Sequence, residues 1–370
     1  MYKIPELPLK QDVETKAVLK QLVQSHRRLA ELKGAVRSMP NPSILINTLS
    51  LQEAKDSSAV ESIITTHDEL FKAELFASQY ATSASKEVQS YADALKKGFT
   101  AVRKNNLLSN NIIIEIYQNI KHNTAGFRTT PGTTLKNDRT GEIVYQPPQS
   151  YDDIIGFMTN LEQFINDDSF CDIDPLVKMA IIHHQFESIH PFSDGNGRTG
   201  RIINILYLVN KELLDLPVLY LSRFIIKNKG QYYSLLQAVR DENQWEAWIL
   251  FMLKGMEETA LETVILIDGI KRLMAEYKSE IRSQFPKIYS QDLLNNLFNH
   301  PYTKIDFLCT DLNITRPTAV AYLSKLEDKF VKKIKLGRDN FYLNTRLFNL
   351  LIDAFHLDTD KSVSSIESVG

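Results

Sequence analysis

Cysteine is scarce in this chain, with only Cys171 and Cys309 among 370 residues. Two cysteines cannot build the disulfide framework of a small secreted scaffold, so a reducing compartment is expected. No run approaches the roughly 18 consecutive apolar residues of a membrane span, and the first residues lack the apolar stretch of a signal peptide. We therefore expect a cytoplasmic protein that has no membrane partner.

An excess of either charge is also missing. Lysine and arginine total 43, against 45 aspartates and glutamates, and the formal net charge is −2. This balance creates no overall field that would hold a polyanion, so any contact with nucleic acid has to be local. The length and a hydrophobic content of 43% allow one large core with one or two smaller units.

Helical periodicity runs through most of the chain and predicts a mainly α fold. The pattern is interrupted at residues 133–145, where two short strand-like runs flank the turn-rich segment Asn137–Gly141. This interruption predicts a short β-hairpin. Further helices are expected over residues 11–36, from Ser43, from Ser57–Ser58 toward Phe76, over 81–121 and over 151–166.

The segment His190–Arg201, HPFSDGNGRTGR, concentrates the chemistry of the chain. An apolar helix that starts at Asp174–Pro175 leads into it, and a second apolar helix follows it. Glycines at 195 and 197 permit positive backbone dihedrals, so N–H groups can converge on an anion at the start of the second helix. These features predict a phosphate-binding turn between two core helices.

The side chains around this turn fit nucleotide transfer. Arg198 and Arg201 lie three residues apart on one helix face, and their forked donors match the oxygens of a polyphosphate. Asp194 can hold a magnesium ion that bridges two phosphates. His190, with a reference pKa of ~6.5, can accept a proton from a hydroxyl nucleophile.

Two other interpretations of this region are possible from the sequence. Gly195–Gly200 matches the dinucleotide fingerprint GxGxxG, but it follows a helix and not a strand, so the βαβ context is missing. His183, His184 and Glu187 have helical spacings that could hold the metal of a hydrolase, although buried histidines more often fill hydrogen-bonding roles. No GxxxxGK[ST] occurs, which excludes a P-loop.

The twelve residues resemble the signature of the Fic family, HxFx[DE]GNGRxxR, at every defined position. The resemblance implies a Fic-type helical bundle with a hairpin flap, and a nucleotidyltransferase that uses ATP and Mg²⁺ to move AMP onto a Ser, Thr or Tyr hydroxyl of a target protein. Phosphorylating relatives carry lysine where this chain has Gly197, so adenylyl transfer is favoured. The roles implied are the base for His190, the metal ligand for Asp194, a core anchor for Phe192, and ATP binding for Gly195, Asn196 (α-phosphate), Gly197, Arg198, Thr199, Gly200 and Arg201.

Two neighbouring segments gain roles from the same resemblance. Tyr232 and Tyr233 are similar to tyrosines that line the adenine pocket of family members, and the alternative is two core residues on a helix. Arg240 stands where some relatives have an adenine-binding asparagine, which leaves the adenine contacts open. The hairpin could pair with an extended target segment as a flap, or be an ordinary surface loop.

Ser57–Ser62 resembles the inhibitory motif [ST]xxxE[GN] of the family. The resemblance implies that Glu61 pairs with Arg201 and blocks productive placement of the γ-phosphate, and that the same glutamate can assist removal of AMP. Ser62 departs from the motif. The alternative is a capping box, in which Ser58 and Glu61 satisfy backbone groups at a helix start.

The last third predicts a winged helix-turn-helix domain, with Thr315 as the cap of its recognition-type helix and a hairpin over Val331–Leu336 and Phe341–Leu343. Basic residues make DNA a candidate partner, and family members often form homodimers, so both partners stay open. The basic residues are Arg316, Lys325, Lys332, Lys333, Lys335 and Arg338.

The expected organisation is therefore modular. The alternatives to an adenylyltransferase are a DNA-binding winged-helix regulator with a vestigial Fic core, and a metal-dependent hydrolase. The expected boundaries are 1–100 for an N-terminal helical region with the inhibitory helix at about 57–65, 101–265 for the catalytic core with its flap at about 126–147, 266–286 for a helical linker, 287–355 for the winged helix-turn-helix and 356–370 for a tail.

Overall fold

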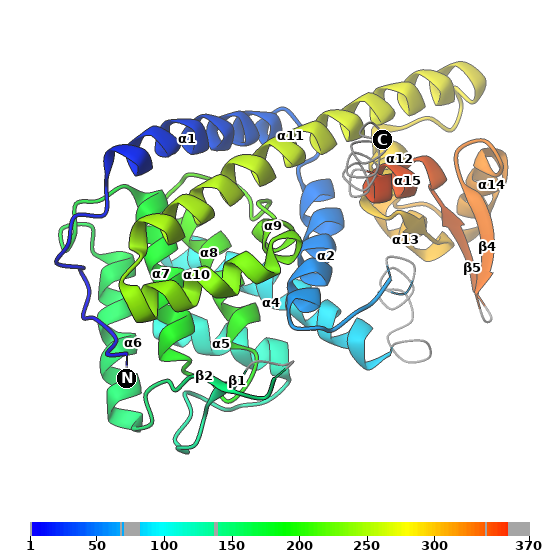
Figure 1. Ribbon diagram of the computed structural model, residues 1–370. Coiled ribbons are helices and arrows are strands. Elements are labelled where there is room, and N and C mark those ends of the chain that lie inside the picture. Colours follow the sequence, from blue (N-terminus) through cyan, green and yellow to red (C-terminus); the bar gives the residue numbers. More distant parts are fainter. Residues whose placement is uncertain (1, 67–68, 70–81, 137–139, 337–338, 354–370) are drawn as a thin grey trace, which may run out of the picture. The chain divides into compact units, whose positions relative to one another are not determined.

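The chain divides into two compact units (Figure 1). None of the described helices is long and apolar enough to cross a membrane. Helices α1, α2 and α11 contribute residues to both units. The first unit is Met1–Lys33 with Ser50–Leu261, the second is Gly34–Leu49 with Glu262–Gly370, and the computed structural model describes residues 2–66, 69, 82–136, 140–336 and 339–353.

Helices dominate the first unit, which agrees with the mainly α fold predicted from the sequence. Its one described sheet is a two-stranded hairpin. The elements are α1 (Lys16–Arg37), α2 (Ser43–Val60), α4 (Ser83–Asn105), α5 (Asn110–Lys121), β1 (Leu135–Lys136), β2 (Ile143–Tyr145), α6 (Tyr151–Asn166), α7 (Pro175–Ile189), α8 (Asn196–Asn210), α9 (Leu221–Lys227), α10 (Lys229–Glu242) and α11 (Trp245–Gln284).

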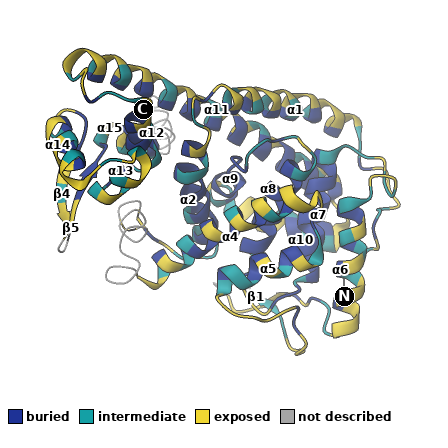
Figure 2. Ribbon diagram, turned by 180° about the vertical axis from the view of Figure 1, so that it is seen from behind, coloured by how far each residue is buried: buried dark blue, intermediate teal, exposed yellow. Residues whose placement is uncertain are grey.

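Helices α7 and α8 form the centre of this unit (Figure 2). Every residue of α7 after Pro175 is buried, and α7 begins where the Asp174 carboxylate accepts the Leu176 N–H at 2.9 Å. Helix α4 comes close to α8 at Gly98, where an added Cβ would lie 2.7 Å from Leu206 Cδ1. The loop between α7 and α8 is therefore held by tightly packed helices.

The predicted hairpin is present as β1 and β2, which pair antiparallel with Leu135 opposite Tyr145. The Tyr145 hydroxyl donates to the Ser188 carbonyl at 2.9 Å, which ties the hairpin to the end of α7. Ile143 is 61% exposed, so this strand keeps an open apolar face. Residues 137–139 of the turn lie outside the described part of the chain.

The N-terminal helices differ from the prediction at one point that matters for the site. Helix α2 runs without a break from Ser43 to Val60, so the expected helix start at Ser57–Ser58 is wrong, and so is an inhibitory helix over 57–65. Serine is common both as a helix cap and within the last turn of a helix, so Ser57 and Ser58 do not by themselves mark a helix start. Phe76, the expected end of that helix, lies outside the described residues.

The second unit carries helices followed by a β-hairpin, the order on which the winged-helix prediction rests. Strand β5 pairs with both β3 and β4. Helix α11 continues to Gln284 and so takes up most of residues 266–286, which were expected to form a linker. Thr315 precedes α14, but its hydroxyl bonds to Thr318 Oγ1 at 2.9 Å and caps no backbone N–H. The elements are α12 (Gln291–Asn299), β3 (Tyr302–Thr303), α13 (Ile305–Leu312), α14 (Arg316–Leu326), β4 (Lys332–Leu336), β5 (Asp339–Leu343) and α15 (Thr345–Asp353), while 337–338 and 354–370 are outside the described residues.

Candidate active site

His190 ends α7 in a left-handed backbone conformation, with φ of 50° and ψ of 59°. A residue other than glycine keeps this conformation only when its surroundings hold it. The His190 N–H donates to the Phe186 carbonyl at 2.9 Å, and the His190 carbonyl accepts from Arg128 Nε at 2.9 Å. These two bonds fix the sharp turn from which the imidazole projects.

The loop after His190 is fastened by Asn196 and Phe192. Asn196 Oδ1 accepts the Phe192 N–H at 2.9 Å, and Asn196 Nδ2 donates to the Phe192 carbonyl at 2.8 Å. The Phe192 ring is fully buried, as predicted, and stacks on Tyr117 with 3.9 Å between ring centroids. Because the loop backbone engages both polar atoms of the Asn196 side chain, that side chain shapes the loop, and its expected contact with the α-phosphate stays a prediction.

Replacing Asn196 with alanine should destabilise the first unit by about 2 kcal/mol, because two buried backbone groups of Phe192 lose their partners. Asn204 is a matched control, since it is equally buried on α8 while its amide has no hydrogen-bond partner among the described residues. Urea denaturation followed by tryptophan fluorescence measures both, because Trp245 and Trp248 are the chain's only tryptophans. Equal losses in the two variants would contradict the role given to Asn196.

Gly195 stands before α8 with φ of 73°, the left-handed region that glycine adopts without strain. The first N–H groups of a helix have no partner inside the helix and attract anions. Gly197 was expected to share the positive dihedral, but it does not. Its missing side chain instead leaves room for a carboxylate, because an added Cβ would lie 2.7 Å from Glu61 Oε1.

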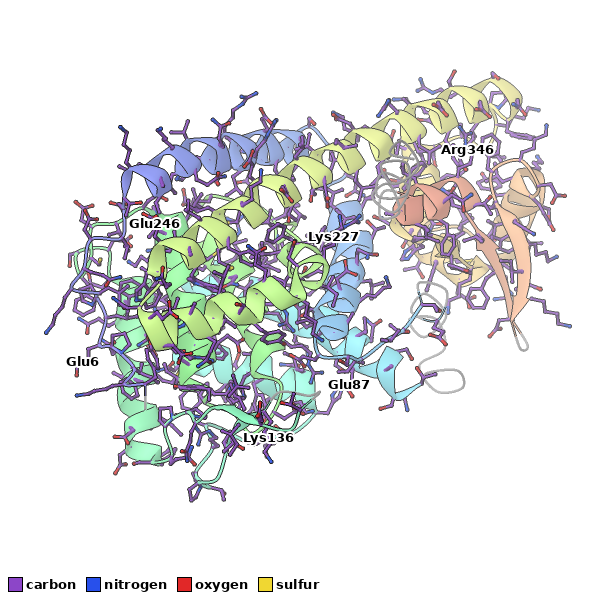
Figure 3. All side chains as sticks on the ribbon, viewed as in Figure 1. Glu6, Glu87, Lys136, Lys227, Glu246 and Arg346 are labelled. Atoms are coloured by element: carbon purple, nitrogen blue, oxygen red, sulfur yellow. The ribbon has the colours of Figure 1, made fainter. Side chains whose placement is uncertain are left out.

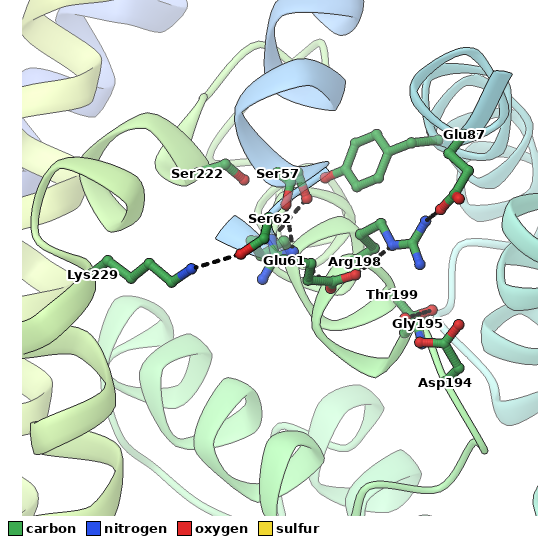
Figure 4. Close-up of polar contacts among 12 residues, drawn as sticks. Ser57, Glu61, Ser62, Glu87, Asp194, Gly195, Arg198, Thr199, Ser222 and Lys229 are labelled. Atoms are coloured by element: carbon green, nitrogen blue, oxygen red, sulfur yellow. Dashed lines mark hydrogen bonds and ion pairs between the residues drawn. The ribbon is translucent and has the colours of Figure 1, made fainter. Parts of the chain in front are cut away.

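The carboxylate of Glu61 lies between Arg198 and Arg201, beside the first turn of α8 (Figure 4). Glu61 Oε2 is 2.7 Å from Arg198 Nε, and Glu61 Oε1 accepts from Arg201 Nη2 at 3.0 Å. The arginine side chains are only 2% and 3% exposed and that of Glu61 is 23% exposed, so water screens these ion pairs only in part. We call the start of α8 together with Arg198 and Arg201 the anion site.

Ser57 holds Arg201 from the last turn of α2. Arg201 Nε donates to Ser57 Oγ at 2.7 Å, and Nη2 donates to the Ser57 carbonyl at 2.8 Å. The Glu61 N–H donates to the Ser58 carbonyl at 3.0 Å, which is the pattern of a helix end. The capping-box alternative for Ser58 and Glu61 is therefore wrong.

Sequence reasoning missed Glu87, which lies on α4. Arg198 Nη1 donates to Glu87 Oε2 at 2.6 Å, so Arg198 contacts two carboxylates from different helices. Glu87 is 111 residues away from Arg198 in sequence, and no motif includes it. Only the packing of α4 against α8 brings the two together.

Three family models match successive segments of the chain. The N-terminal model of the Fic/DOC family matches residues 19–100, the Fic/DOC family model matches residues 107–208, and the C-terminal domain model of SoFic-like protein adenylyltransferases matches residues 273–347. The chain belongs to the Fic family. All residues of the anion site fall inside the Fic/DOC match over residues 107–208, and Glu61 falls inside the N-terminal match.

Curated relatives of this Fic protein match it only in part. A protein adenylyltransferase of Caenorhabditis elegans is 30% identical over 89 residues, which are 24% of this chain and 16% of that protein. A probable protein adenylyltransferase of Aquifex aeolicus is 28% identical over 138 residues, 37% of this chain and 39% of that one. The chain thus spans well under half the length of both relatives.

A solved structure has the same fold over nearly the whole chain. It is a Fic family protein from Desulfovibrio desulfuricans with a TM-score of 0.54 and 16% sequence identity. The match covers 92% of this chain and 98% of that one. The Fic fold therefore extends well beyond the twelve residues of the signature.

Asp194, the metal ligand expected from the Fic signature, is 62% exposed and lies 2.5 Å from Lys121 Nζ. Partial burial opposes ionisation, but the hydrogen bond from Lys121 prevails and lowers the pKa of Asp194. Within the described ranges, no three His, Cys, Asp or Glu side chains gather to hold a metal. One ionised carboxylate beside an anion site fits Mg²⁺, which commonly binds through one or two carboxylates and substrate phosphates.

Thr199 and Gly200 turn toward the core and away from the anion site. The Thr199 hydroxyl donates to the Gly195 carbonyl at 2.9 Å. A Cβ at Gly200 would lie 3.0 Å from Glu187 Oε1 and 3.1 Å from Phe186 Cδ1, so glycine allows α7 and α8 to approach. Both residues therefore have packing roles, and their expected contacts with ATP stay predictions.

The two tyrosines expected at the adenine have different environments. Tyr232 is buried, and its ring centroid lies 5.7 Å from that of Trp248, which favours the core alternative for this residue. Tyr233 is 47% exposed and stays a candidate for stacking on adenine. Arg240 lies 4.0 Å above the Tyr145 ring and donates to Ser188 Oγ at 3.2 Å, so it links the flap to α7.

The histidines of α7 do not form a metal site. His183 Nε2 is 2.9 Å from the Tyr232 hydroxyl, while His184 Nε2 is 3.2 Å from the Leu236 carbonyl. Burial lowers the pKa of His183 to about 3 and that of His184 well below its usual value, so both are neutral. The metal-hydrolase alternative therefore gains no support.

Proposed function

We propose that this protein is an adenylyltransferase that moves AMP from ATP onto a Ser, Thr or Tyr hydroxyl of a target protein. The observation that carries the proposal is the Glu61 carboxylate beside the first turn of α8 and between two buried arginines. An environment that holds a carboxylate in this way offers the same donors to a phosphate. The adenylyltransferase names of the relatives favour this reaction.

In this mechanism His190 removes the proton of the target hydroxyl, and the hydroxyl oxygen attacks the α-phosphorus of ATP. The bond between the α-phosphorus and the bridging oxygen breaks, and diphosphate leaves. Arg198 and Arg201 hold the outer phosphates and stabilise the charge that develops on diphosphate. Mg²⁺ on Asp194, when bound, would neutralise charge on the phosphates.

The flap supplies a binding edge for the target. Strand β2 exposes Ile143 and Val144, and the Tyr145 hydroxyl fastens its end to α7 two residues before His190. An extended segment that pairs with such an edge would bring its hydroxyl toward the imidazole. Backbone pairing is tolerant of sequence, which suits a target recognised mainly by its extended shape.

Glu61 acts as an inhibitor in this proposal, because it contacts both arginines that the outer phosphates need. Ser62, the departure from the inhibitory motif, has a φ of 65°. The Ile63 N–H donates to the Ser58 carbonyl at 3.0 Å, so Ser62 stands where a helix end favours glycine or asparagine. The inhibitory motif has glycine or asparagine at this position because these residues adopt a positive φ most easily.

Ser62→Gly should stabilise the end of α2 by about 1 kcal/mol, because glycine adopts this dihedral without strain. Inhibition should tighten accordingly, and basal labelling should fall by about fivefold. The rate of AMP incorporation in the presence of ATP measures the effect. A faster reaction in Ser62→Gly would contradict the inhibitory role of this segment.

The pH dependence of the transfer rate should reveal a catalytic base, His190, whose pKa is lower than usual. Burial, followed by the positive charges of Arg128 and Arg240, lowers the pKa of His190 to about 4. The imidazole therefore gains its proton only as the pH falls toward about 4, and the rate in Glu61→Gly should stay flat from about pH 8 to about pH 5 before it falls. Single-turnover rates across this range measure it, and a midpoint near the usual histidine pKa would contradict the assignment.

Mass spectrometry tests the proposed function. Glu61→Gly is incubated with ATP, Mg²⁺ and a cell extract, and modified peptides are sequenced. AMP on hydroxyl side chains is expected, and the Glu61→Gly/His190→Ala double variant should yield none. Absence of AMP from every protein, the enzyme included, would overturn the proposal.

A further inference from the structure

Arg198 is held on two sides by carboxylates that belong to different helices. Glu87 lies on α4 (Figure 3), and Figure 4 shows Glu61 and Glu87 approaching the guanidinium from opposite sides. Glu61 is 2.7 Å from Nε, whereas Glu87 is 2.6 Å from Nη1. The two carboxylates therefore use different nitrogens and do not compete for one donor.

The covalent geometry of the guanidinium decides what each contact can do. Nε and Nη2 share one edge of the planar fork, and Nη1 lies outside that edge. Nη2 is 3.7 Å from the position of a Cβ at Gly195, beside the start of α8. A phosphate that displaces Glu61 can take the Nε and Nη2 edge with two parallel bonds, while Nη1 stays on Glu87.

We propose that Glu87 is a positioning residue, which keeps the Nε–Nη2 edge of Arg198 directed at the outer phosphates of ATP after Glu61 has left. This inference rests on the proposed function, because it assumes that the anion site takes those phosphates. It concerns a residue outside the signature and outside the inhibitory motif.

Arg201 offers an instructive contrast. Arg201 donates hydrogen bonds to Ser57 and Glu61, which belong to one segment at the end of α2. Movement of that segment would therefore break both contacts. The residue that holds Arg198 is on α4, a separate helix that packs against α8 through Gly98 and also contacts α2, where the Tyr91 hydroxyl donates to Glu53 Oε1 at 3.0 Å. Arg198 therefore keeps a fixed orientation in the released state, and a long side chain loses less entropy when phosphate binds.

Calorimetric titration of ATP, ADP or AMP into the protein in the presence of Mg²⁺ tests the positioning role of Glu87, with Glu61→Gly as the parent. Glu87→Ala removes charge and acceptor, whereas Glu87→Gln keeps an oxygen that can accept from Nη1. We expect Glu87→Ala to weaken the affinity for ATP by about tenfold and to leave the affinity for AMP unchanged. The ATP affinity of Glu87→Gln should stay within about threefold of the parent. Asp93→Ala is the control, because Asp93 is on the same helix and pairs only with Gln89 among its described contacts.

The inference would be overturned by unchanged ATP affinity in Glu87→Ala, by equal weakening of ATP and AMP binding, by equal weakening of ATP binding in both Glu87 variants, or by tighter ATP binding in both. Tighter ATP binding in both variants would mean that Glu87 competes with the phosphates for Arg198. These measurements need no transfer reaction, so a parent that binds ATP without modifying protein would end the proposed function and leave this inference standing. A parent whose affinity for ATP does not exceed that for AMP would overturn the inference itself.

Discussion

Glu61→Gly should incorporate AMP into protein about 100-fold faster than the unaltered chain, because it frees both arginines of the anion site at once. The size follows from the roughly 3 kcal/mol associated with removing one partner of a poorly solvated ion pair. Both arginine side chains are at most 3% exposed, so water cannot replace Glu61 cheaply in the inhibited state. Initial rates of AMP incorporation at limiting ATP measure the effect.

Glu61→Gln refines this experiment, since it keeps the length of the side chain and removes its charge. Glu61 uses one oxygen for each arginine, whereas the amide has a single oxygen and no negative charge, so it cannot hold both Arg198 and Arg201 and most of the release is expected. Equal rates in the unaltered chain and both variants would contradict inhibition by Glu61. Release in Glu61→Gly alone would assign the effect to the backbone at the end of α2.

His190→Ala in the Glu61→Gly background should lower the rate by about 1000-fold, in line with the loss of a positioned general base. ATP affinity should be unchanged, because the imidazole is absent from the contacts that form the anion site. Calorimetry and single-turnover kinetics on the same preparation separate the two quantities. A comparable loss of ATP affinity would show that the substitution has disturbed the loop and would void the assignment of His190 as base.

The signature segment could be predicted from sequence because its residues are close together. His190, Asp194 and the two arginines lie within twelve positions, so helical spacing alone brings Arg198 and Arg201 to one face. The flanking apolar helices followed from composition. Contacts over long sequence separation gave no such signal, and Glu87 was missed for this reason.

The sequence is least decisive where one residue type serves two purposes. Ser57 and Ser58 resemble helix caps but lie in the last turn of α2, because buried apolar residues carry that helix through them. Asn196 has the side chain of a phosphate ligand and also holds the Phe192 backbone. Tyr232 resembles an adenine contact and packs against Trp248. Polarity and spacing cannot separate these roles, since burial decides them.

The position of a radiolabel in ATP tests the central claim most directly. Glu61→Gly is incubated with ATP labelled at the α-phosphate and, in parallel, with ATP labelled at the γ-phosphate, and protein-bound label is counted. The account predicts strong label from the α-position, none from the γ-position, and none from either when His190 is also replaced by alanine. Label from the γ-position, or equal α-label with and without His190, would contradict it.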